Sequence, residues 1–319
     1  MVSYSAQQFE SEYPLKTETE QIEAIVPISY YARYVRLFRR LPHAVLRRLT
    51  RKKCQGYSIM APHLAGKNGL EIGGPSEIFR PGRLIPVYER FGKIDHCNFS
   101  SQTIWSDAAD RKKFGPHLGK QFVAEASDLS MIPDEAYSFV LASHVLEHVA
   151  NPLRALQEWT RVLKPQGALL VVVPHKRGTF DHRRAFTSFD HIEADFQAGV
   201  SEDDLTHLRE IVELHDLNLD PAADSQHRFR ERCMSNSSVR GMHHHVFSPE
   251  VLVLMFTWLH MRVLNVAIER PFHIVGFAQK TGPGEMEQVR LDNLGYLNEN
   301  AEWKKCNPFH EPGFLGDLN

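Results

Sequence analysis

Histidine is the residue type best suited to acid–base chemistry near neutral pH, and this chain concentrates it in one region. The chain has 18 histidines, which crowd between His175 and His245. A neutral imidazole can remove a proton from an alcohol or an amine, and a neighbouring aspartate can orient the ring for that task. Residues 181–184 (Asp-His-Arg-Arg) and 243–245 (His-His-His) supply both residue types.

Alternating positions of an extended segment face the same side, which would place His243 and His245 together. Three interpretations stay open: a polar network that orients a substrate, a metal site completed by Asp181, His182 or His191, and plain structural histidines. The chain has no HExxH spacing and no cysteine pair, so we assign no metal. The candidate catalytic residues are His243, His245, His182, His175 and Asp181.

A second segment with chemical potential, residues 70–76 (Leu-Glu-Ile-Gly-Gly-Pro-Ser), leaves an apolar run and turns through two glycines. Glycine allows a positive φ and lets a ligand approach without meeting a Cβ atom. The segment departs from the GxGxxG dinucleotide fingerprint, because Pro75 and Ser76 follow the glycines. Glu71, just before the turn, would repel a phosphate but suits a ligand that carries an ammonium and a sulfonium.

The elements that must position these residues follow from the hydrophobic pattern. From Gly66 on, short apolar runs alternate with helical stretches, the pattern of βαβ units in a mainly parallel sheet. Strands are predicted at 68–72, 94–98, 121–126, 137–142, 168–174, 262–268 and 273–278, and helices at 152–163 and 249–260. In such a sheet, the carboxyl end of the first strand is where a nucleotide-like ligand binds.

The pattern divides the chain into five parts. These are an N-terminal helical segment or lid at 1–60, a ligand-binding core at 61–175, a substrate-side insertion at 176–247, the C-terminal part of the core at 248–280, and a tail at 281–319 that we expect to be irregular. Residues 30–53 combine apolar residues at helical spacing with many arginines, which fits either a solvated basic helix face or a lid.

Three blocks of the predicted core together resemble a known family. Residues 126–129 read Ala-Ser-Asp-Leu, residues 142–149 read Ala-Ser-His-Val-Leu-Glu-His-Val, and residues 163–170 read Leu-Lys-Pro-Gln-Gly-Ala-Leu-Leu. With the Gly-Gly turn, they resemble the type 11 class of the class I S-adenosylmethionine-dependent methyltransferase superfamily over about residues 66–174. The resemblance implies an α/β fold: a doubly wound, Rossmann-like, seven-stranded and mostly parallel sheet, here with an N-terminal helical cap and a His-rich insertion after strand five.

The same resemblance implies S-adenosylmethionine as the cofactor. The implied contacts are Glu71, Gly73 and Gly74 at the methionine part, with Pro75 and Ser76 in the same turn, Asp128 and Leu129 at the adenine, and Ser143 with His144 at the methionine end. Pro75 and Ser76 replace the family's third glycine. The acid expected at the end of strand two has two candidates, and we favour Asn98, which ends the strand, over Asp95, which lies inside it.

The predicted function is transfer of a methyl group to an oxygen or nitrogen of a polar small molecule. The DHRR and HxHVF blocks resemble a subset of these enzymes linked with glycan or secondary-metabolite assembly, so a sugar or secondary metabolite is the expected substrate. An alternative enzyme would attack another carbon of the sulfonium, by cyclisation or aminocarboxypropyl transfer, and release methylthioadenosine. A third reading is a non-catalytic module that binds S-adenosylmethionine.

Composition limits the partners. The 319 residues are 42% hydrophobic and 24% charged with a formal net charge of -2, which argues against a nucleic-acid partner held by a broad positive field. No stretch approaches the ~20 apolar residues of a membrane span, so we expect no membrane insertion. Four scattered cysteines and an acidic N-terminal segment indicate free thiols in the cytoplasm rather than a secreted protein. A small-molecule substrate is the expected partner, and a homodimer stays open.

Overall fold

The sheet is the frame on which every candidate residue is placed. The computed structural model describes residues 53–90, 92–101, 118–220, 222–223 and 225–309, so the predicted N-terminal cap falls outside it up to residue 52. Within these residues seven strands form one sheet: β1 (Gly69–Ile72), β2 (Ile94–Asn98), β3 (Leu118–Val123), β4 (Tyr137–Ser143), β5 (Leu163–Pro174), β6 (Met261–Glu269) and β7 (His273–Lys280).

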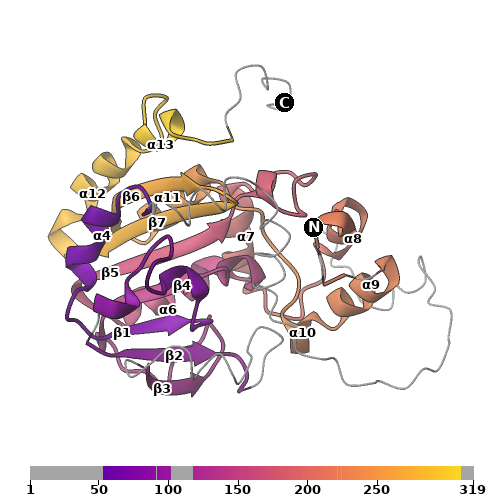
Figure 1. Ribbon diagram of the computed structural model, residues 1–319, viewed down its shortest axis with the longest axis horizontal. Helices are drawn as coiled ribbons and strands as arrows, with labels where there is room; N and C mark the ends of the chain where they lie inside the picture. The colour runs from indigo at the N-terminus through magenta and orange to yellow at the C-terminus, as the bar shows by residue number, and fades with distance from the viewer. Residues whose placement is uncertain (1–52, 91, 102–117, 221, 224, 310–319) are drawn as a thin grey trace.

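The strand order is β3-β2-β1-β4-β5-β7-β6 (Figure 1). β7 pairs antiparallel with both β5 and β6, whereas the pairs among β1 to β5 are parallel. The order reverses between β1 and β4, since β2 and β3 extend the sheet to one side and β5 to the other. The prediction of a doubly wound, seven-stranded, mostly parallel sheet is therefore confirmed.

The third and fifth strands differ most from their predicted bounds. β3 begins and ends three residues earlier than predicted, because its pairing with β2 runs from Leu118 to Val123. β5 begins at Leu163 instead of residue 168, although its residues 164–166 (Lys-Pro-Gln) are exposed. An apolar run marks the buried length of a strand, and β5 continues into solvent beyond that length.

The helices cover both faces of the sheet. α6 (Pro152–Arg161) begins where the Asn151 side chain accepts the Arg154 backbone N–H, and α11 (Pro249–Trp258) where Ser248 accepts that of Val251. Both pack in one apolar cluster with Val140 of β4, whereas α4 (Tyr57–Leu64) packs in a second cluster with the next and preceding residues of that strand. Successive strand residues face opposite sides, so one strand contributes to both clusters.

The insertion between β5 and α11 is helical. It contains η4 (Lys176–Gly178), α7 (Phe189–Ala198), α8 (Leu208–Leu214), η5 (Leu217–Leu219), α9 (Gln226–Met234) and α10 (Asn236–Val239). Figure 1 shows α8, α9 and α10 beside the sheet, on the side toward which the arrows of β1 and β2 point. Most of the insertion thus lies beyond the carboxyl ends of the parallel strands.

The prediction of an irregular tail is wrong for the described residues. η6 (Pro283–Glu285), α12 (Met286–Leu294) and α13 (Glu302–Lys305) follow β7. The buried Asn293 side chain holds α12 on β6, since it accepts the Val263 N–H at 2.9 Å and donates to the Met261 carbonyl at 2.9 Å. A polar residue makes this attachment, so hydrophobic periodicity gave no sign of the helix.

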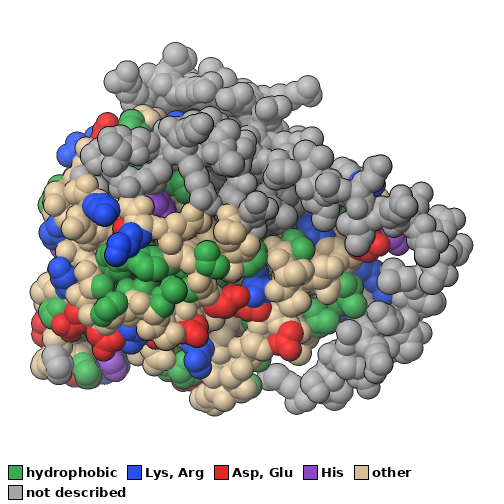
Figure 2. All heavy atoms as spheres, turned by 90° about the horizontal axis from the view of Figure 1, so that it is seen from below, with side chains coloured by type: hydrophobic (Ala, Val, Ile, Leu, Met, Phe, Trp, Pro, Cys, Tyr) green, Lys and Arg blue, Asp and Glu red, His purple; other side chains and the backbone are tan. Residues whose placement is uncertain are grey.

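The surface mixes charges of both signs. On the face shown in Figure 2, basic and acidic side chains of the described residues are interspersed, and apolar side chains gather most clearly on the left of the view. Among the described helices, none has the length and apolar character needed to cross a membrane.

The contact between α11 and β7 generates the first prediction. A Cβ atom on Gly276 of β7 would lie 2.5 Å from Leu252 Cδ2 and 2.8 Å from Phe256 Cε2. We expect Gly276→Ala to lower the free energy of unfolding by about 1–3 kcal/mol, as overpacking does. Urea denaturation measures it. Gly282→Ala is the control, because its Cβ atom would meet nothing closer than Glu285 Oε1 at 3.6 Å; equal stability losses would contradict the packing argument.

Candidate functional site

The turn after β1 needs glycine for reasons of shape and of space. Gly73 has φ +73, and a Cβ atom there would lie 2.3 Å from Val145 Cγ2. Its N–H donates to the Cys97 carbonyl of β2 at 2.8 Å, which fixes the turn against the neighbouring strand. The Val145 side chain, from the segment that follows β4, therefore packs directly on the backbone at the carboxyl end of β1, in the space that a Cβ atom on residue 73 would need.

Glu71 supports this turn from inside the protein. Its fully buried carboxylate accepts the Ser76 N–H at 2.9 Å and the Tyr88 hydroxyl at 2.7 Å, and His96 Nδ1 lies 3.5 Å away. A Cβ atom on Gly74 would lie 2.2 Å from the Glu71 Cδ atom. Burial raises the pKa of Glu71 to about 7. Both carboxylate oxygens thus have partners within the protein.

Of the two candidates on β2, Asn98 is the one at the turn. Its side-chain nitrogen donates to the Gly74 carbonyl at 3.0 Å. Asp95 instead accepts the Lys120 N–H at 2.7 Å and the Tyr137 hydroxyl at 2.8 Å. The aspartate therefore braces β3 and β4 farther back in the sheet.

The residues predicted for the adenine lie in different surroundings. Asp128 is exposed, and the Ser130 N–H that it accepts at 3.0 Å lowers its pKa. Leu129 is fully buried, and its N–H donates to Glu158 at 2.8 Å. An acidic residue that the sequence analysis passed over, Glu125, lies two residues beyond β3.

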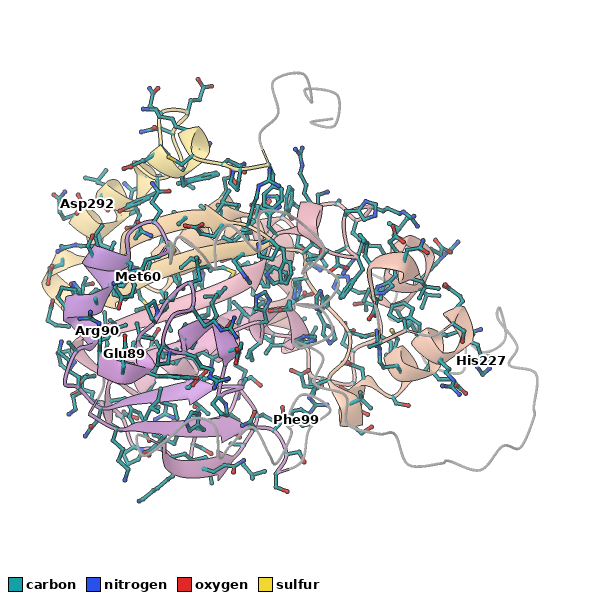
Figure 3. The ribbon with its side chains drawn as sticks, viewed as in Figure 1. Met60, Glu89, Arg90, Phe99, His227 and Asp292 are labelled. Carbon is teal, nitrogen blue, oxygen red and sulfur yellow. The ribbon has the colours of Figure 1, made fainter. Side chains whose placement is uncertain are left out.

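Glu125 joins the core to the insertion through Arg240. The guanidinium, directly after α10, pairs with Glu125 at 2.5 Å and lies 5.2 Å above the ring of Phe99, which is labelled in Figure 3. Its Nε atom is also 3.7 Å from Glu202. Arg240 therefore spans from the carboxyl ends of β2 and β3 to the insertion.

The end of β4 carries Ser143, which is buried, and His144, whose φ is +54. His144 Nε2 lies 2.9 Å from Nδ1 of His273, and its Nδ1 lies 3.3 Å from Glu147. Burial opposes ionisation of Glu147, but the hydrogen bond from His144 and the charges of the surrounding histidines lower its pKa overall. The structure thus adds Glu147 and His273 to the residues beside the predicted site.

His243 and Asp181 are the predicted catalytic residues that the structure brings together. His243 Nδ1 lies 2.5 Å from Asp181 Oδ2. Burial opposes the effect, but His243 and the Arg184 guanidinium hold the pKa of Asp181 well below its usual range. The His243 ring meets the ring of His148 edge to face, with centroids 4.7 Å apart. His148 belongs to η3 (Leu146–His148), the turn after β4, so His243 packs beside the carboxyl end of that strand.

His148 is itself held in one orientation. Its Nδ1 lies 2.9 Å from the Met242 carbonyl, to which it donates, and burial lowers its pKa to about 4. One ligand atom each of Glu147, His148 and His243 lies within 4.8 Å of the others. A carboxylate and two imidazoles therefore gather next to the end of β4.

The other predicted catalytic histidines lie apart from His243. The buried His245 places Nε2 3.0 Å from Asp195, and His182 pairs with Asp216 at 2.9 Å on the outer side of the insertion. His175 stacks on Phe309 at 4.5 Å, and burial lowers its pKa to about 4. Residues 241–248 form no strand, so the alternation expected for His243 and His245 does not join them in one site.

Arg184 connects two acidic side chains of the insertion with the backbone of the histidine run 243–245. It is 1% exposed, and its guanidinium donates to Asp181 at 3.1 Å and to Glu210 at 3.1 Å. It also donates to the backbone carbonyls of His243 at 2.8 Å and His244 at 3.1 Å. Nothing in the sequence distinguishes it from the adjacent Arg183, which is half-exposed.

Part of the core is similar in sequence to a known family. Residues 81–171 match the family model described as Methyltransferase domain, Methyltransf_11. No curated protein matches the chain in sequence.

Similar solved structures include a SAM dependent methyltransferase from Aquifex aeolicus (13% identity, 78% of this chain and 97% of that chain, TM-score 0.41). Others are the N-methyltransferase NodS from Bradyrhizobium japonicum WM9 (11%, 76% and 99%, 0.43) and 1,6-didemethyltoxoflavin-N1-methyltransferase from Burkholderia thailandensis (14%, 82% and 94%, 0.42). Likeness at this level says nothing about the substrate of this chain.

The buried Arg184 generates a stability prediction. We expect Arg184→Met to lower the free energy of unfolding by about 3–5 kcal/mol, because it leaves a buried carboxylate and two buried carbonyls without their donor. Urea denaturation measures the loss. Arg183→Met is the matched control and should cost less than about 1 kcal/mol, since its side chain is 49% exposed and pairs with Asp216 at the surface. Similar costs for both variants would show that Arg184 has no special role.

Glu71 generates a pH prediction. Its pKa in the folded protein, about 7, exceeds the ordinary 4.5, so the folded protein retains a proton that the unfolded chain releases between these values. The contribution of Glu71 to stability is therefore present at low pH and lost as the pH rises through about 7. Glu71→Gln stays neutral, so its stability should rise relative to the parent protein across that range in thermal unfolding. Glu89→Gln, at an exposed carboxylate labelled in Figure 3, is the control, and an equal pH trend there would contradict the assignment.

Proposed function

Since the core of this chain belongs to the class I S-adenosylmethionine-dependent methyltransferase superfamily, we propose that the protein transfers a methyl group to an oxygen or nitrogen of a polar small molecule. The observation that carries this proposal is the His243–Asp181 pair, packed against the turn that follows β4. The proposed substrate class is a sugar or a secondary metabolite with a hydroxyl or amino group.

The proposed cofactor position is the edge where the strand order reverses between β1 and β4, the usual ligand crevice of a doubly wound sheet. Gly73 and Gly74 form the turn directly after β1, and Ser143 and His144 lie at the end of β4, so the proposal assigns the methionine part of the cofactor to these two neighbouring strand ends. Asn98 is favoured for the ribose hydroxyls, since it stands beside Gly74.

The outer cofactor contacts divide into direct and supporting ones. Asp128 is exposed, and besides the Ser130 N–H its carboxylate can accept a further hydrogen bond from the adenine amino group. The Leu129 N–H and the Glu71 carboxylate already make hydrogen bonds inside the protein. The proposal therefore assigns these two residues to shaping the site. Pro75 and Ser76 complete the same turn, and the Ser76 N–H points to Glu71 and Tyr88.

The proposed chemistry is a direct displacement. The substrate oxygen or nitrogen forms a bond to the methyl carbon as the carbon–sulfur bond breaks, and sulfur keeps the electron pair. Alignment of the three atoms supplies much of the rate, and a base is needed only for the proton on the nucleophile. His243 donates its Nδ1–H to Asp181, which leaves Nε2 to accept that proton.

Of the four candidate histidines, His243 is the proposed base. The His245 side chain is fully buried and engaged with Asp195, whereas His243 retains some exposure beside the end of β4. His182 and His175 have surface and stacking partners, and the proposal gives neither of them a proton-transfer role.

The test separates catalysis from cofactor binding. With an acceptor found among hydroxylated and aminated sugars and metabolites, His243→Ala should lower kcat by about 10²–10⁴-fold, the usual contribution of a positioned base. The affinity for S-adenosylmethionine, measured by calorimetry, should stay unchanged. His182→Ala is the control and should retain kcat. Unchanged turnover in the His243 variant would refute its proposed role.

Products discriminate the remaining alternatives. Mass spectrometry after incubation with S-adenosylmethionine alone should show no methylthioadenosine. Its release without an acceptor would contradict methyl transfer and favour attack on another carbon of the sulfonium. A calorimetric titration without cofactor affinity would contradict both enzyme proposals.

A further inference from the structure

We infer that the insertion holds a divalent transition-metal ion of the zinc type, bound by His191, Asp195, His207 and His245. One ligand atom from each of these four side chains lies within 4.8 Å of all the others. The inference concerns a place distinct from the His243–Asp181 pair, and it does not depend on methyl transfer.

The distances match those around a small tetrahedral cation. His191 Nε2 lies 3.1 Å from His207 Nε2 and 3.2 Å from Asp195 Oδ2, and His245 Nε2 lies 3.0 Å from the same oxygen. Ligand atoms about 2.0–2.1 Å from a tetrahedral zinc ion are about 3.3 Å from one another. The nitrogen atoms and the carboxylate oxygen thus converge as they would on a shared cation.

Hydrogen bonding alone accounts poorly for this convergence. A neutral imidazole nitrogen carries either one hydrogen or one lone pair. His191 Nε2 faces both an acceptor, Asp195, and the nitrogen of His207, so a hydrogen on it can be well directed to only one of them. A cation between them would accept a lone pair from each of the three histidines and from the aspartate.

The four ligands come from three segments of the insertion. His191 and Asp195 stand one turn apart on α7, His207 directly precedes α8, and His245 lies in the segment before α11. The three imidazole rings surround the position, with centroids 4.9 Å, 5.4 Å and 5.8 Å apart. One ion would tie these segments together.

The ligands also have the outer support that metal sites show. Glu210 places Oε2 3.9 Å from His207 Nδ1, while its other oxygen accepts from Arg184 at 3.1 Å. At 3.9 Å this contact is electrostatic and too long for a hydrogen bond, but a carboxylate on this side of His207 favours the ring orientation that turns the other nitrogen toward the metal. The same buried arginine therefore steadies both Glu210 and the proposed base.

The donor set indicates the kind of ion. Three imidazoles and one carboxylate suit zinc and its first-row neighbours, whereas calcium and magnesium prefer oxygen ligands only. Four protein ligands fill a tetrahedral ion, which is typical of a structural site. His191 is 30% exposed on its side chain and His245 is fully buried, so the ion would enter from the His191 side.

A structural ion also suits the composition of the insertion. Among the residues that the structure describes, the apolar cluster around α8 and α9 has five fully buried members: Leu208, Ile211, Phe229, Cys233 and Met242. A covalent crosslink or a bound metal ion stabilises the folded state of so small a core, because the free energy of metal binding adds to that of folding.

Metal content is measured on the full chain after removal of any affinity tag. Plasma mass spectrometry should find about one zinc-type ion per chain. After chelation, Co²⁺ should restore a tetrahedral ligand-field spectrum that saturates at about one equivalent, and Zn²⁺ should raise the midpoint of thermal unfolding. Less than about a tenth of an ion per chain after reloading with either metal would overturn the inference.

Variants locate the site. His191→Ala removes the most exposed ligand and should weaken Co²⁺ binding by more than about 100-fold, while Glu210→Gln should weaken it by about 10-fold. His227→Ala is the matched control, since His227 is exposed at the outer end of α9 (Figure 3) and should leave binding unchanged. Equal losses in His227→Ala and His191→Ala, or full affinity in His191→Ala, would overturn the inference. Far-ultraviolet circular dichroism of each variant establishes that it is folded.

Discussion

Arg184 has a buried guanidinium, whose charge must be balanced by ion-pair and hydrogen-bond partners. The arrangement of the insertion follows from the contacts that this side chain makes. Its side chain is 1% exposed and reaches two carboxylates and two backbone carbonyls. Those carbonyls belong to His243 and His244, so the arginine fixes the backbone that carries the histidine run. A buried charge destabilises the folded state unless it is fully paired. The loss of any one of these contacts would leave part of the guanidinium unpaired, so the contacts hold one another in place.

The sheet edge depends on a similar internal network. Glu71, Tyr88 and the Ser76 N–H close the turn after β1, and Asn98 attaches its other side to β2. The hydrogen bonds that hold the turn therefore come from the protein itself. A preorganised turn of this kind saves the free energy that ordering it during binding would cost.

The histidines divide among separate carboxylates. Asp181 pairs with His243, Asp195 pairs with both His245 and His191, and Asp216 pairs with His182. Each carboxylate sets the orientation of the ring it meets, so neighbouring histidines in the sequence acquire different environments. Arg184 contacts both proposed places, since it donates to Asp181 beside His243 and to Glu210 near His207.

The sequence by itself determined the sheet, the turn after β1 and the resemblance of the core to a methyltransferase domain. Apolar runs at strand spacing, a capped helix start at Asn151 and the Gly73-Gly74 pair are local signals, because backbone geometry and burial act over a few residues. The observed order of the strands agrees with the predicted doubly wound sheet. The shift of β3 and the helix α12 escaped it, since both depend on pairing with distant residues.

Only the tertiary structure decided the partners of the histidines. His191 and Asp195 carry a local signal, since residues four apart share one face of a helix, but His207 and His245 join them from other segments. Likewise, nothing in the run 243–245 indicates that His243 meets Asp181 and His245 meets Asp195. A titratable side chain takes its function from the charges that folding places around it, and those charges lie tens of residues away along the chain.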